Sequence, residues 1–281
     1  MSDGRADSGS TFRAPISVVV PCYRCKATLR RAIASVAGQS TRPAEIVLVD
    51  DGSDDDTLGL LMDVQREFGE NWVKVIALGK NRGPSDARNA GWAAASGKYI
   101  AFLDADDAWH PRKLEIQHAF METHPEVALC GHFHRRLSNG DDLDTPLNRP
   151  GFRIISLWAL LLSNRFHPTS VIVRRDVPLR FASGRRHMED HLLWIQIASE
   201  GRQIARLSEV LSFTFKSPLG TSGLSAHTWQ MRRGELANYW ALHGSGRLGV
   251  AATLALSAYS LAKHLIRSLL LVAWREPPKN R

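Results

Sequence analysis

The stretch Tyr99-Ile100-Ala101-Phe102-Leu103-Asp104-Ala105-Asp106-Asp107 decides the fold that we expect for this chain. Its first five residues are apolar or aromatic, which indicates a buried strand that ends where the carboxylates begin. Open α/β sheets bind their ligands beyond the carboxyl ends of the strands. Asp104 and Asp106, separated by one small residue, can converge there on a hard cation such as Mg²⁺ or Mn²⁺. An acidic turn ahead of a helix that begins at Pro111 would have the same pattern.

Three strand-like runs precede this stretch, and a helical pattern follows each of them. Residues 16–21, 45–50 and 73–78 have the composition of strands, and residues 27–39, 58–68 and 85–96 carry apolar side chains at helical spacing. Strands that alternate with helices predict an α/β fold with a mostly parallel central sheet flanked by helices.

Polar residues follow each predicted strand, so a single rim of the sheet should collect them. They are residues 21–23, residues 50–53, residues 81–83 and the acidic group after Leu103. Neither a Gly-x-Gly-x-x-Gly motif nor a Walker lysine motif follows any of these strands. We therefore expect a nucleotide to be bound by carboxylates on its base and ribose and by a metal on its diphosphate, without a glycine-rich cradle.

The composition is that of an ordinary globular protein, with 44% hydrophobic and 23% charged residues among 281. Residues 1–14 are polar and lack an apolar run, which predicts a disordered leader and not a signal peptide. Three cysteines favour a reducing compartment over a disulfide framework. The spacing Cys22-x-x-Cys25 is also that of a thioredoxin-like redox pair, which is an alternative function for this segment. Cys130 is typical of a small core residue.

The C-terminal segment, residues 228–281, is basic, with eight Lys or Arg against two Glu. No zinc-finger or RNA-binding signature accompanies it, so we expect no nucleic-acid partner. The uncharged run 248–262 is shorter than the roughly 20 residues of a membrane span. On a helix, Thr253 and Lys263 share a polar face opposite Leu254 and Leu261, which predicts a basic amphipathic helix at a membrane interface. A helix packed on the rest of the chain, or on a dimer partner, would have the same pattern.

Five motifs in order resemble the family 2 inverting glycosyltransferases of the GT-A fold. They are Ser-Val-Val-Val-Pro-Cys-Tyr (17–23), Val-Asp-Asp-Gly-Ser-x-Asp-x-Thr (49–57), Asn-Arg-Gly-x-Ser-x-Ala-Arg-Asn-x-Gly (81–91), Leu-Asp-Ala-Asp-Asp (103–107) and Met-Glu-Asp-x-x-Leu-Trp (188–194). The resemblance covers about residues 15 to 215. It implies a Rossmann-like half that binds a nucleotide sugar.

The resemblance implies donor-binding roles for residues on the predicted rim. Pro21 and Tyr23 would line the pocket of the nucleotide base, and Asp51 would hydrogen-bond the base. Arg88 would approach the base or the diphosphate, and Asp104 would hold ribose or sugar hydroxyls.

The resemblance also implies the reacting groups. Asp106 would bind the divalent metal, Mn²⁺ or Mg²⁺, on the diphosphate, and Asp190 would be the base that deprotonates the acceptor hydroxyl. A metal neutralises such a leaving group, and a carboxylate within hydrogen-bond reach activates the hydroxyl. Two features depart from the pattern: Arg24 stands where Asn is often found, and the spacing to Trp194 lets Glu189 compete with Asp190 for the role of base.

We expect residues 15–227 to form the GT-A domain, with a nucleotide-sugar-binding half (15–110) and an acceptor half (111–227), and residues 228–281 to form a helical tail. In the acceptor half we expect a loop at 134–150, a helix at 154–163 and a flexible flap at 214–225. We expect His167 either to contact the acceptor or the sugar or to have a structural role.

The predicted activity is metal-dependent, inverting transfer from a nucleotide-diphosphate sugar to a lipid-linked or polysaccharide acceptor. Its predicted place is the cytoplasmic face of the inner membrane, bound peripherally. A nucleotidyltransferase and a non-catalytic nucleotide-sugar-binding membrane protein are the alternatives.

Overall fold

The computed structural model of the chain describes residues 13–138, 140–147, 151–215 and 228–273, the last seven of these without their side chains. The predicted leader lies outside this range except for Arg13 and Ala14, which open the first strand. The predicted flap lies outside it except for Thr214 and Phe215.

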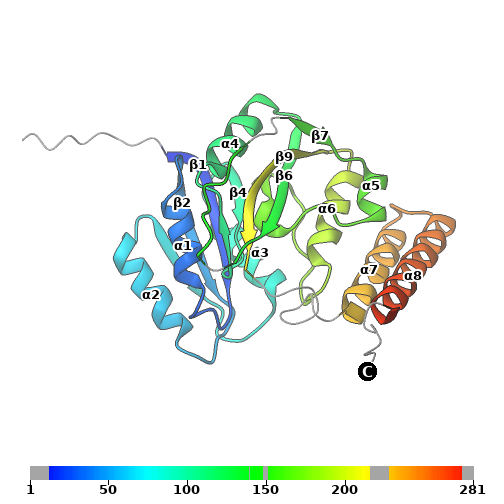
Figure 1. Cartoon of the computed structure of the whole chain (residues 1–281), viewed down its shortest axis with the longest axis horizontal. Coiled ribbons are helices and arrows are strands. Elements are labelled where there is room, and N and C mark those ends of the chain that lie inside the picture. Colours follow the sequence, from blue (N-terminus) through cyan, green and yellow to red (C-terminus); the bar gives the residue numbers. More distant parts are fainter. Residues whose placement is uncertain (1–12, 139, 148–150, 216–227, 274–281) are drawn as a thin grey trace, which may run out of the picture.

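The N-terminal half contains the predicted parallel sheet (Figure 1). Its strands are β1 (Arg13–Cys22), β2 (Arg42–Asp50), β3 (Val73–Ala77) and β4 (Tyr99–Phe102), paired in the order β3-β2-β1-β4. The helices between them are α1 (Leu29–Ala37), α2 (Thr57–Phe68) and α3 (Pro84–Ala94). All three pairings are parallel, as the alternation of strands and helices predicts.

The second half extends the same sheet in the order β4-β8-β6-β9-β5, with β7 on β9. Its elements are β5 (Asp107–Trp109), α4 (Lys113–Thr123), β6 (Val127–Arg136), β7 (Phe152–Ile154), α5 (Leu157–Leu162), the 3₁₀ turn η1 (Pro168–Ser170), β8 (Ile172–Arg174), α6 (Glu189–Ser199) and β9 (Gln203–Thr214). Here only β6 and β9 are parallel. The central sheet flanked by helices is confirmed, and its parallel pairings are the three of the N-terminal half and that of β6 with β9.

Two predicted boundaries in this half are wrong. Residues 134–136 continue β6 and do not begin a loop, because β9 pairs with β6 along its whole length. Ile154 ends β7 and does not open the helix, which begins at Leu157. The Ser156 hydroxyl accepts a hydrogen bond from the Ala159 amide (3.2 Å) and caps the helix there.

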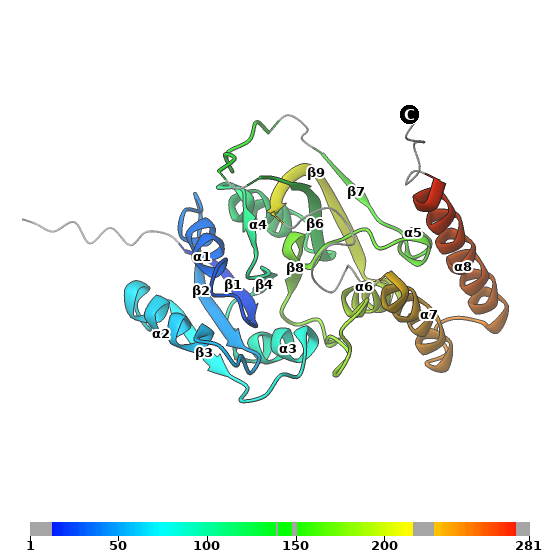
Figure 2. The same ribbon diagram turned by 60° about the horizontal axis from the view of Figure 1, so that its bottom comes forward.

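Two hydrophobic cores lie on the two faces of the sheet. Val18 and Val20 face the core shared with α1, α2 and α4, whereas Val19 between them faces the core shared with α3, α5 and α6. This alternation follows from the two-residue period of a strand whose faces are both covered. Figure 2 shows the sheet between these helices, with the carboxyl ends of β1 and β4 turned toward the second half.

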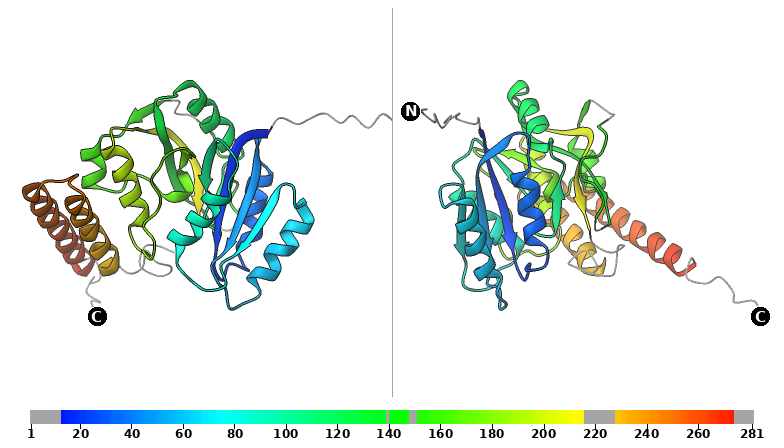
Figure 3. Two further views of the ribbon diagram at one scale, coloured as in Figure 1. Left: turned by 180° about the vertical axis from the view of Figure 1, so that it is seen from behind. Right: turned by 60° about the vertical axis from the view of Figure 1, so that its left-hand side comes forward.

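The chain ends in a helical hairpin of α7 (Thr228–Gly244) and α8 (Val250–Ala273). α7 packs against α6, and α8 lies at the outer edge of the molecule beside α7 (Figure 3). Among the described helices, none combines the length and the apolar character that a bilayer crossing requires.

Candidate active site

A cavity of about 720 Å³ opens at the carboxyl ends of the central strands. The residues predicted for the site all line it: Pro21, Tyr23, Asp51, Arg88, Asp104, Asp106, Glu189 and Asp190. They come from all five motifs. Four of these motifs follow parallel strands that end at a common edge, and the fifth opens α6 beside that edge. Their individual roles remain predictions.

The loops that follow β1 and β2 form one wall of the cavity and are held by hydrogen bonds and an ion pair. Asp51 is buried and accepts hydrogen bonds from the amides of Arg82 (2.7 Å) and Gly83 (2.8 Å). Its carboxylate thereby fixes the loop after β3 as well as facing the cavity. The Tyr23 ring is 42% exposed, and the Arg24 guanidinium lies 5.3 Å from its centre while pairing with Asp54. An exposed ring beside a cavity offers a stacking surface for a nucleotide base.

Arg88 of α3 lies buried at the centre of the site. It donates hydrogen bonds to Asp104 (2.8 Å) and to Glu189 (2.9 Å). Burial alone would lower the pKa of Arg88, but the charges of Asp104 and Glu189 outweigh it and raise the pKa. Arg88 therefore holds two carboxylates together, and its approach to the base or the diphosphate stays a prediction.

Glu189 and Asp190 open α6 but lie in different environments. Glu189 is buried against Arg88; burial and the neighbouring Asp190 raise its pKa, against the lowering effect of Arg88. Asp190 is only partly buried, and its Oδ2 accepts a hydrogen bond from the Asn164 amide group (2.9 Å). Of the two carboxylates, Asp190 is thus the one held by a neutral donor at the cavity.

The turn that presents this pair is strained and is held by α7. Met188 has a φ of 58°, in the left-handed region that side chains other than glycine seldom adopt. The Asn238 side chain donates to the Met188 carbonyl (2.8 Å). A Cβ at Gly234 would lie 2.7 Å from the His187 carbonyl, so α7 approaches this turn as closely as a glycine allows. The first helix of the predicted tail therefore supports the site.

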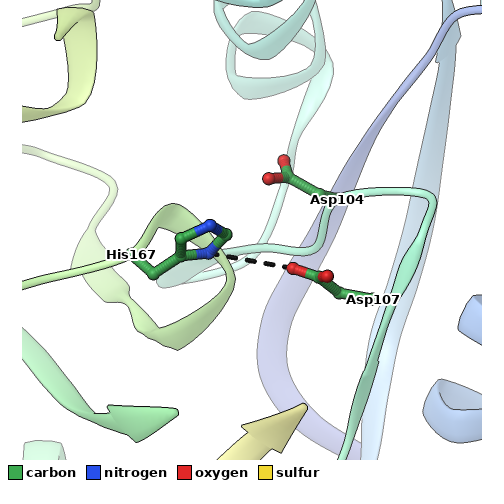
Figure 4. A group of neighbouring side chains, drawn as sticks. All are labelled: Asp104, Asp107 and His167. Atoms are coloured by element: carbon green, nitrogen blue, oxygen red, sulfur yellow. Dashed lines mark ion pairs between the residues drawn. The ribbon is translucent and has the colours of Figure 1, made fainter. Parts of the chain in front are cut away.

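A second acidic group lies where β4 ends. Asp104 lies in the turn after β4, Asp107 opens β5, and His167 faces them from the loop before η1 (Figure 4). One ligand atom from each lies within 4.8 Å of the others, and His167 Nδ1 is 3.7 Å from Asp107 Oδ2. Thr169 donates to the same Asp107 oxygen (2.7 Å).

The chemistry of this group fits a divalent cation. Asp107 is buried, and its Oδ1 has no hydrogen-bond partner among the described residues. Burial raises the pKa of Asp107, His167 lowers it, and the charges of Asp104 and Asp106 raise it. The net result is a pKa of about 6. A buried carboxylate with an unsatisfied oxygen is a costly arrangement that a cation would relieve.

The structure differs from the sequence-based expectation in three side chains. Asp106 lines the cavity but is not part of this three-residue group. Asp107 and His167 belong to this group. The sequence pattern predicted no role for Asp107, and for His167 either a contact to the acceptor or the sugar or a structural role. In the sequence, Asp107 could have been found as the extension of Asp-x-Asp by a third acidic residue, and His167 as a histidine directly before a proline. Asn164, which holds Asp190, had no signal, because one Asn in a polar loop is unremarkable in sequence.

The surroundings of the cysteine pair disfavour a redox-active site of the thioredoxin kind. Cys22 and Cys25 are free and buried. The contact with Cys25, followed by burial, raises the pKa of the Cys22 thiol, which disfavours the reactive thiolate. Cys130 is buried in the core, as predicted.

The central sheet, with the cavity at its carboxyl edge, has the GT-A fold that the sequence predicted. Residues 17–178 match the model of the family described as Glycosyl transferase family 2, and the chain belongs to this family. The family resemblance, the fold class and the enzyme class predicted from the sequence are thereby confirmed.

Known proteins resemble the chain over different lengths. An uncharacterized glycosyltransferase of Nostoc sp. is 40% identical over 117 residues, covering 42% of this chain and 36% of that protein. The Escherichia coli protein WfgD, a UDP-Glc:alpha-D-GlcNAc-diphosphoundecaprenol beta-1,3-glucosyltransferase, is 28% identical over 66% of this chain and 70% of its own. The mannosyltransferase PcManGT from Pyrobaculum calidifontis, solved with GDP-Man and Mn²⁺, shares the fold with a TM-score of 0.60 and 17% identity, covering 94% of this chain and 81% of that one.

Proposed function

We propose that this protein transfers a sugar from a nucleotide-diphosphate sugar to an acceptor hydroxyl, with a divalent metal and with inversion at the anomeric carbon. One observation carries the proposal. Two acidic segments, Asp104–Asp106 and Glu189–Asp190, line one cavity and are joined through the buried Arg88. The first segment suits the diphosphate of a donor, and the second suits the hydroxyl of an acceptor.

The proposed metal lies at the turn after β4. Asp104, Asp107 and His167 would hold it, with the predicted ligand Asp106 next to them. A metal bound there would act as a Lewis acid that neutralises the charge of the departing nucleoside diphosphate. Two carboxylates with one imidazole suit Mn²⁺ better than Mg²⁺, which prefers oxygen ligands. The Mn²⁺ in the complex of the Pyrobaculum mannosyltransferase supports this choice for the fold.

The proposed base is Asp190. It lines the cavity, and its hydrogen bond from Asn164 leaves the carboxylate able to take a proton from the acceptor hydroxyl. Glu189 is a poorer candidate because it is buried and its Oε1 is bound to Arg88. A single base that drives one displacement inverts the anomeric carbon, so an α-linked donor should give a β-linked product.

The proposed acceptor is a saccharide on a lipid carrier or on a growing polysaccharide. The Escherichia coli relative, whose name gives a diphosphoundecaprenol-linked acceptor, supports the lipid-linked form. Because a lipid-linked acceptor lies in the membrane, we propose that the protein is bound peripherally to the cytoplasmic face of the membrane.

The test is a panel of nucleotide sugars offered to the purified protein with Mn²⁺, with and without lipid-linked saccharides, measuring the nucleoside diphosphate released. The proposal expects release from at least one donor, stimulated by an acceptor and abolished by excess chelator. Release of pyrophosphate from a nucleoside triphosphate would favour the nucleotidyltransferase alternative. Donor binding without turnover on any acceptor would favour a binding protein and contradict the proposal.

A further inference from the structure

The helix α8 presents its apolar side outward. Between residues 250 and 266, every exposed side chain is apolar or aromatic: Val250, Ala251, Leu254, Ala255, Ala258, Tyr259, Leu261, Ala262, Leu265 and Ile266. We call these residues the outer face of α8. Leu254, Leu265 and Ile266 are 55%, 60% and 58% exposed. A contiguous apolar face of this kind is uncommon on a soluble monomer and marks an interaction surface.

The polar residues of α8 face the protein. Thr253 and Ser260 are fully buried, and the Ser260 hydroxyl donates to Glu235 of α7 (2.8 Å). Lys263 pairs with Glu235 (3.1 Å) and also donates to the Leu162 carbonyl of α5 (3.3 Å). The polar face predicted to meet lipid headgroups is therefore bound to α7 and α5. The orientation of α8 is fixed by these bonds, and it leaves the outer face uncovered.

The surroundings of the outer face match an anionic, interfacial partner. Between residues 228 and 266, Glu235 is the single carboxylate among the described side chains, and it is buried. Arg233 of α7 is exposed. Trp229 of α7 is 56% exposed and its ring lies 5.9 Å from that of His264, and Trp240 of α7 is 48% exposed. Trp and Tyr are enriched where proteins meet the headgroup layer, and exposed cations without exposed acids suit anionic lipids.

We propose that the outer face of α8 inserts into the headgroup–acyl boundary of an anionic lipid bilayer, with α8 lying along the membrane plane. The occupant is a lipid surface, and the contact is a shallow one because no described helix can cross a bilayer. The affinity comes mainly from the leucines and aromatic rings, since Lys263 is already paired within the protein.

This placement sets the acceptor side of the cavity next to the membrane, a consequence that rests on the proposed function. Leu162, whose carbonyl binds Lys263 of α8, is two residues from Asn164, which holds Asp190. Trp158 of α5 is 60% exposed, and Arg165 is exposed and lines the cavity. A saccharide carried on a membrane lipid phosphate would thus meet a cation and the proposed base close to the lipid surface. The inference narrows the acceptor class to lipid-linked saccharides.

The experiment is flotation of the full chain with vesicles of phosphatidylethanolamine and phosphatidylglycerol, with phosphatidylcholine vesicles as the neutral comparison. The test variant combines Leu254→Gln, Leu261→Gln and Leu265→Gln, which keeps a helix-forming residue at each exposed position. The matched control combines Leu58→Gln and Met62→Gln, exposed apolar residues of α2 that are 37% and 44% exposed. Light scattering measures the oligomeric state of each protein, and thermal unfolding checks that each is folded.

We expect the wild type and the control to float with anionic vesicles, more weakly with neutral ones, and the triple variant to bind about a hundredfold less. Wild-type protein that stays unbound, or a triple variant that floats like the wild type, would overturn the inference. A wild-type dimer that the triple variant dissolves, without vesicle binding by either, would assign the face to a second copy of the chain.

Nucleoside diphosphate release without vesicles separates this inference from the proposed function. The triple variant should retain the wild-type rate of donor hydrolysis in water, because none of its three positions lines the cavity. If the protein floats with vesicles but turns over no donor, the proposed function is wrong and the proposed lipid binding by α8 is retained.

Discussion

The guanidinium of Arg88 donates to Glu189 (2.9 Å) with one nitrogen and to Asp104 (2.8 Å) with another. A single buried cation thus joins the turn proposed for the donor to the helix start proposed for the acceptor. Because Glu189 is occupied in this way, we propose its neighbour Asp190 as the carboxylate that takes the proton. The competition between these two residues, which the sequence left open, is decided in our proposal by this contact.

Glu189 should prove to be an anchor. Glu189→Gln removes the negative charge and leaves Arg88 with a weaker partner, and breaking a buried pair costs about 3–5 kcal/mol. We expect a lower melting temperature and a reduced rate that partly recovers at temperatures where the variant remains folded. A stable Glu189→Gln protein with no activity would instead make Glu189 the base.

Much of the N-terminal half was predictable because each local pattern agreed with the next. Strands such as residues 45–50 have a β-branched run and an acidic end, and their parallel pairing follows from the helices between them. The second half was harder because β6 and β9 pair across more than sixty residues, which no local pattern reports. His134 was misplaced for that reason, and Ile154 was misplaced because β7 pairs with β9, which is also distant in the sequence.

The candidate site was predictable where a motif places chemistry at a strand end, and not where contacts cross the fold. The motifs named eight residues that do line one cavity. They did not reveal that Arg88 would be bound by two carboxylates or that Asn164 would hold Asp190, because both contacts join distant segments. For α8, the periodicity of the sequence predicted a polar face and an apolar face. It did not predict that the polar face packs against α7 and α5.

Metal binding should distinguish the two candidate ligand sets. Asp107→Asn and His167→Ala should each weaken Mn²⁺ binding about 10–100-fold if the three-residue group holds the ion, as loss of a ligand or of its support does in other sites. Titration calorimetry with Mn²⁺ in the presence of nucleoside diphosphate measures this. Asp106→Ala tests the ligand that the family resemblance implies, and it should weaken Mn²⁺ binding if Asp106 contacts the ion. Unchanged Mn²⁺ affinity in Asp107→Asn and His167→Ala would exclude the group as the metal site.

Glu45 should make the fold sensitive to acid. Its carboxylate accepts hydrogen bonds from Ser17 (2.6 Å) and Ser96 (2.6 Å) and pairs with Lys74 (2.5 Å). Burial alone would raise the pKa of Glu45, but these partners lower it to about 2, from a usual value of 4.5. A lowered folded-state pKa stabilises the fold fully above pH 4.5, and this contribution is lost as the pH falls toward 2.

Glu45→Gln should therefore cost about 2–3 kcal/mol of unfolding free energy at pH 7. Its difference from the wild type should shrink as the pH falls between 4.5 and 2. Urea denaturation at several pH values measures both quantities, and a difference that stays constant over this window would refute the assignment.

Lys113 should limit stability at neutral pH. It is fully buried, its Nζ has no hydrogen-bond partner among the described residues, and the Trp109 ring centre lies 4.0 Å away. Burial lowers the pKa of Lys113 to about 7 from 10.5. The unfolded chain then binds more protons than the folded one between pH 7 and 10.5, so stability rises with pH across this window.

Lys113→Met keeps the length of the side chain and removes the buried amine. We expect it to raise the unfolding free energy at pH 7 by about 2 kcal/mol and to flatten the rise between pH 7 and 10. Denaturant titrations at pH 7 and pH 9.5 compare the two proteins. A variant that is less stable at both values would show that the amine has a polar partner.

The most direct test of the central claim is the rate of sugar transfer by Asp190→Asn, measured with Mn²⁺, a donor found in the nucleotide-sugar panel and its acceptor. The amide keeps the size of the side chain and its contact with Asn164 but cannot take a proton. Loss of a general base typically costs about 10²–10⁴-fold, and we predict a fall of that size in kcat with donor binding unchanged. A folded Asp190→Asn protein that transfers sugar at the wild-type rate would contradict the account.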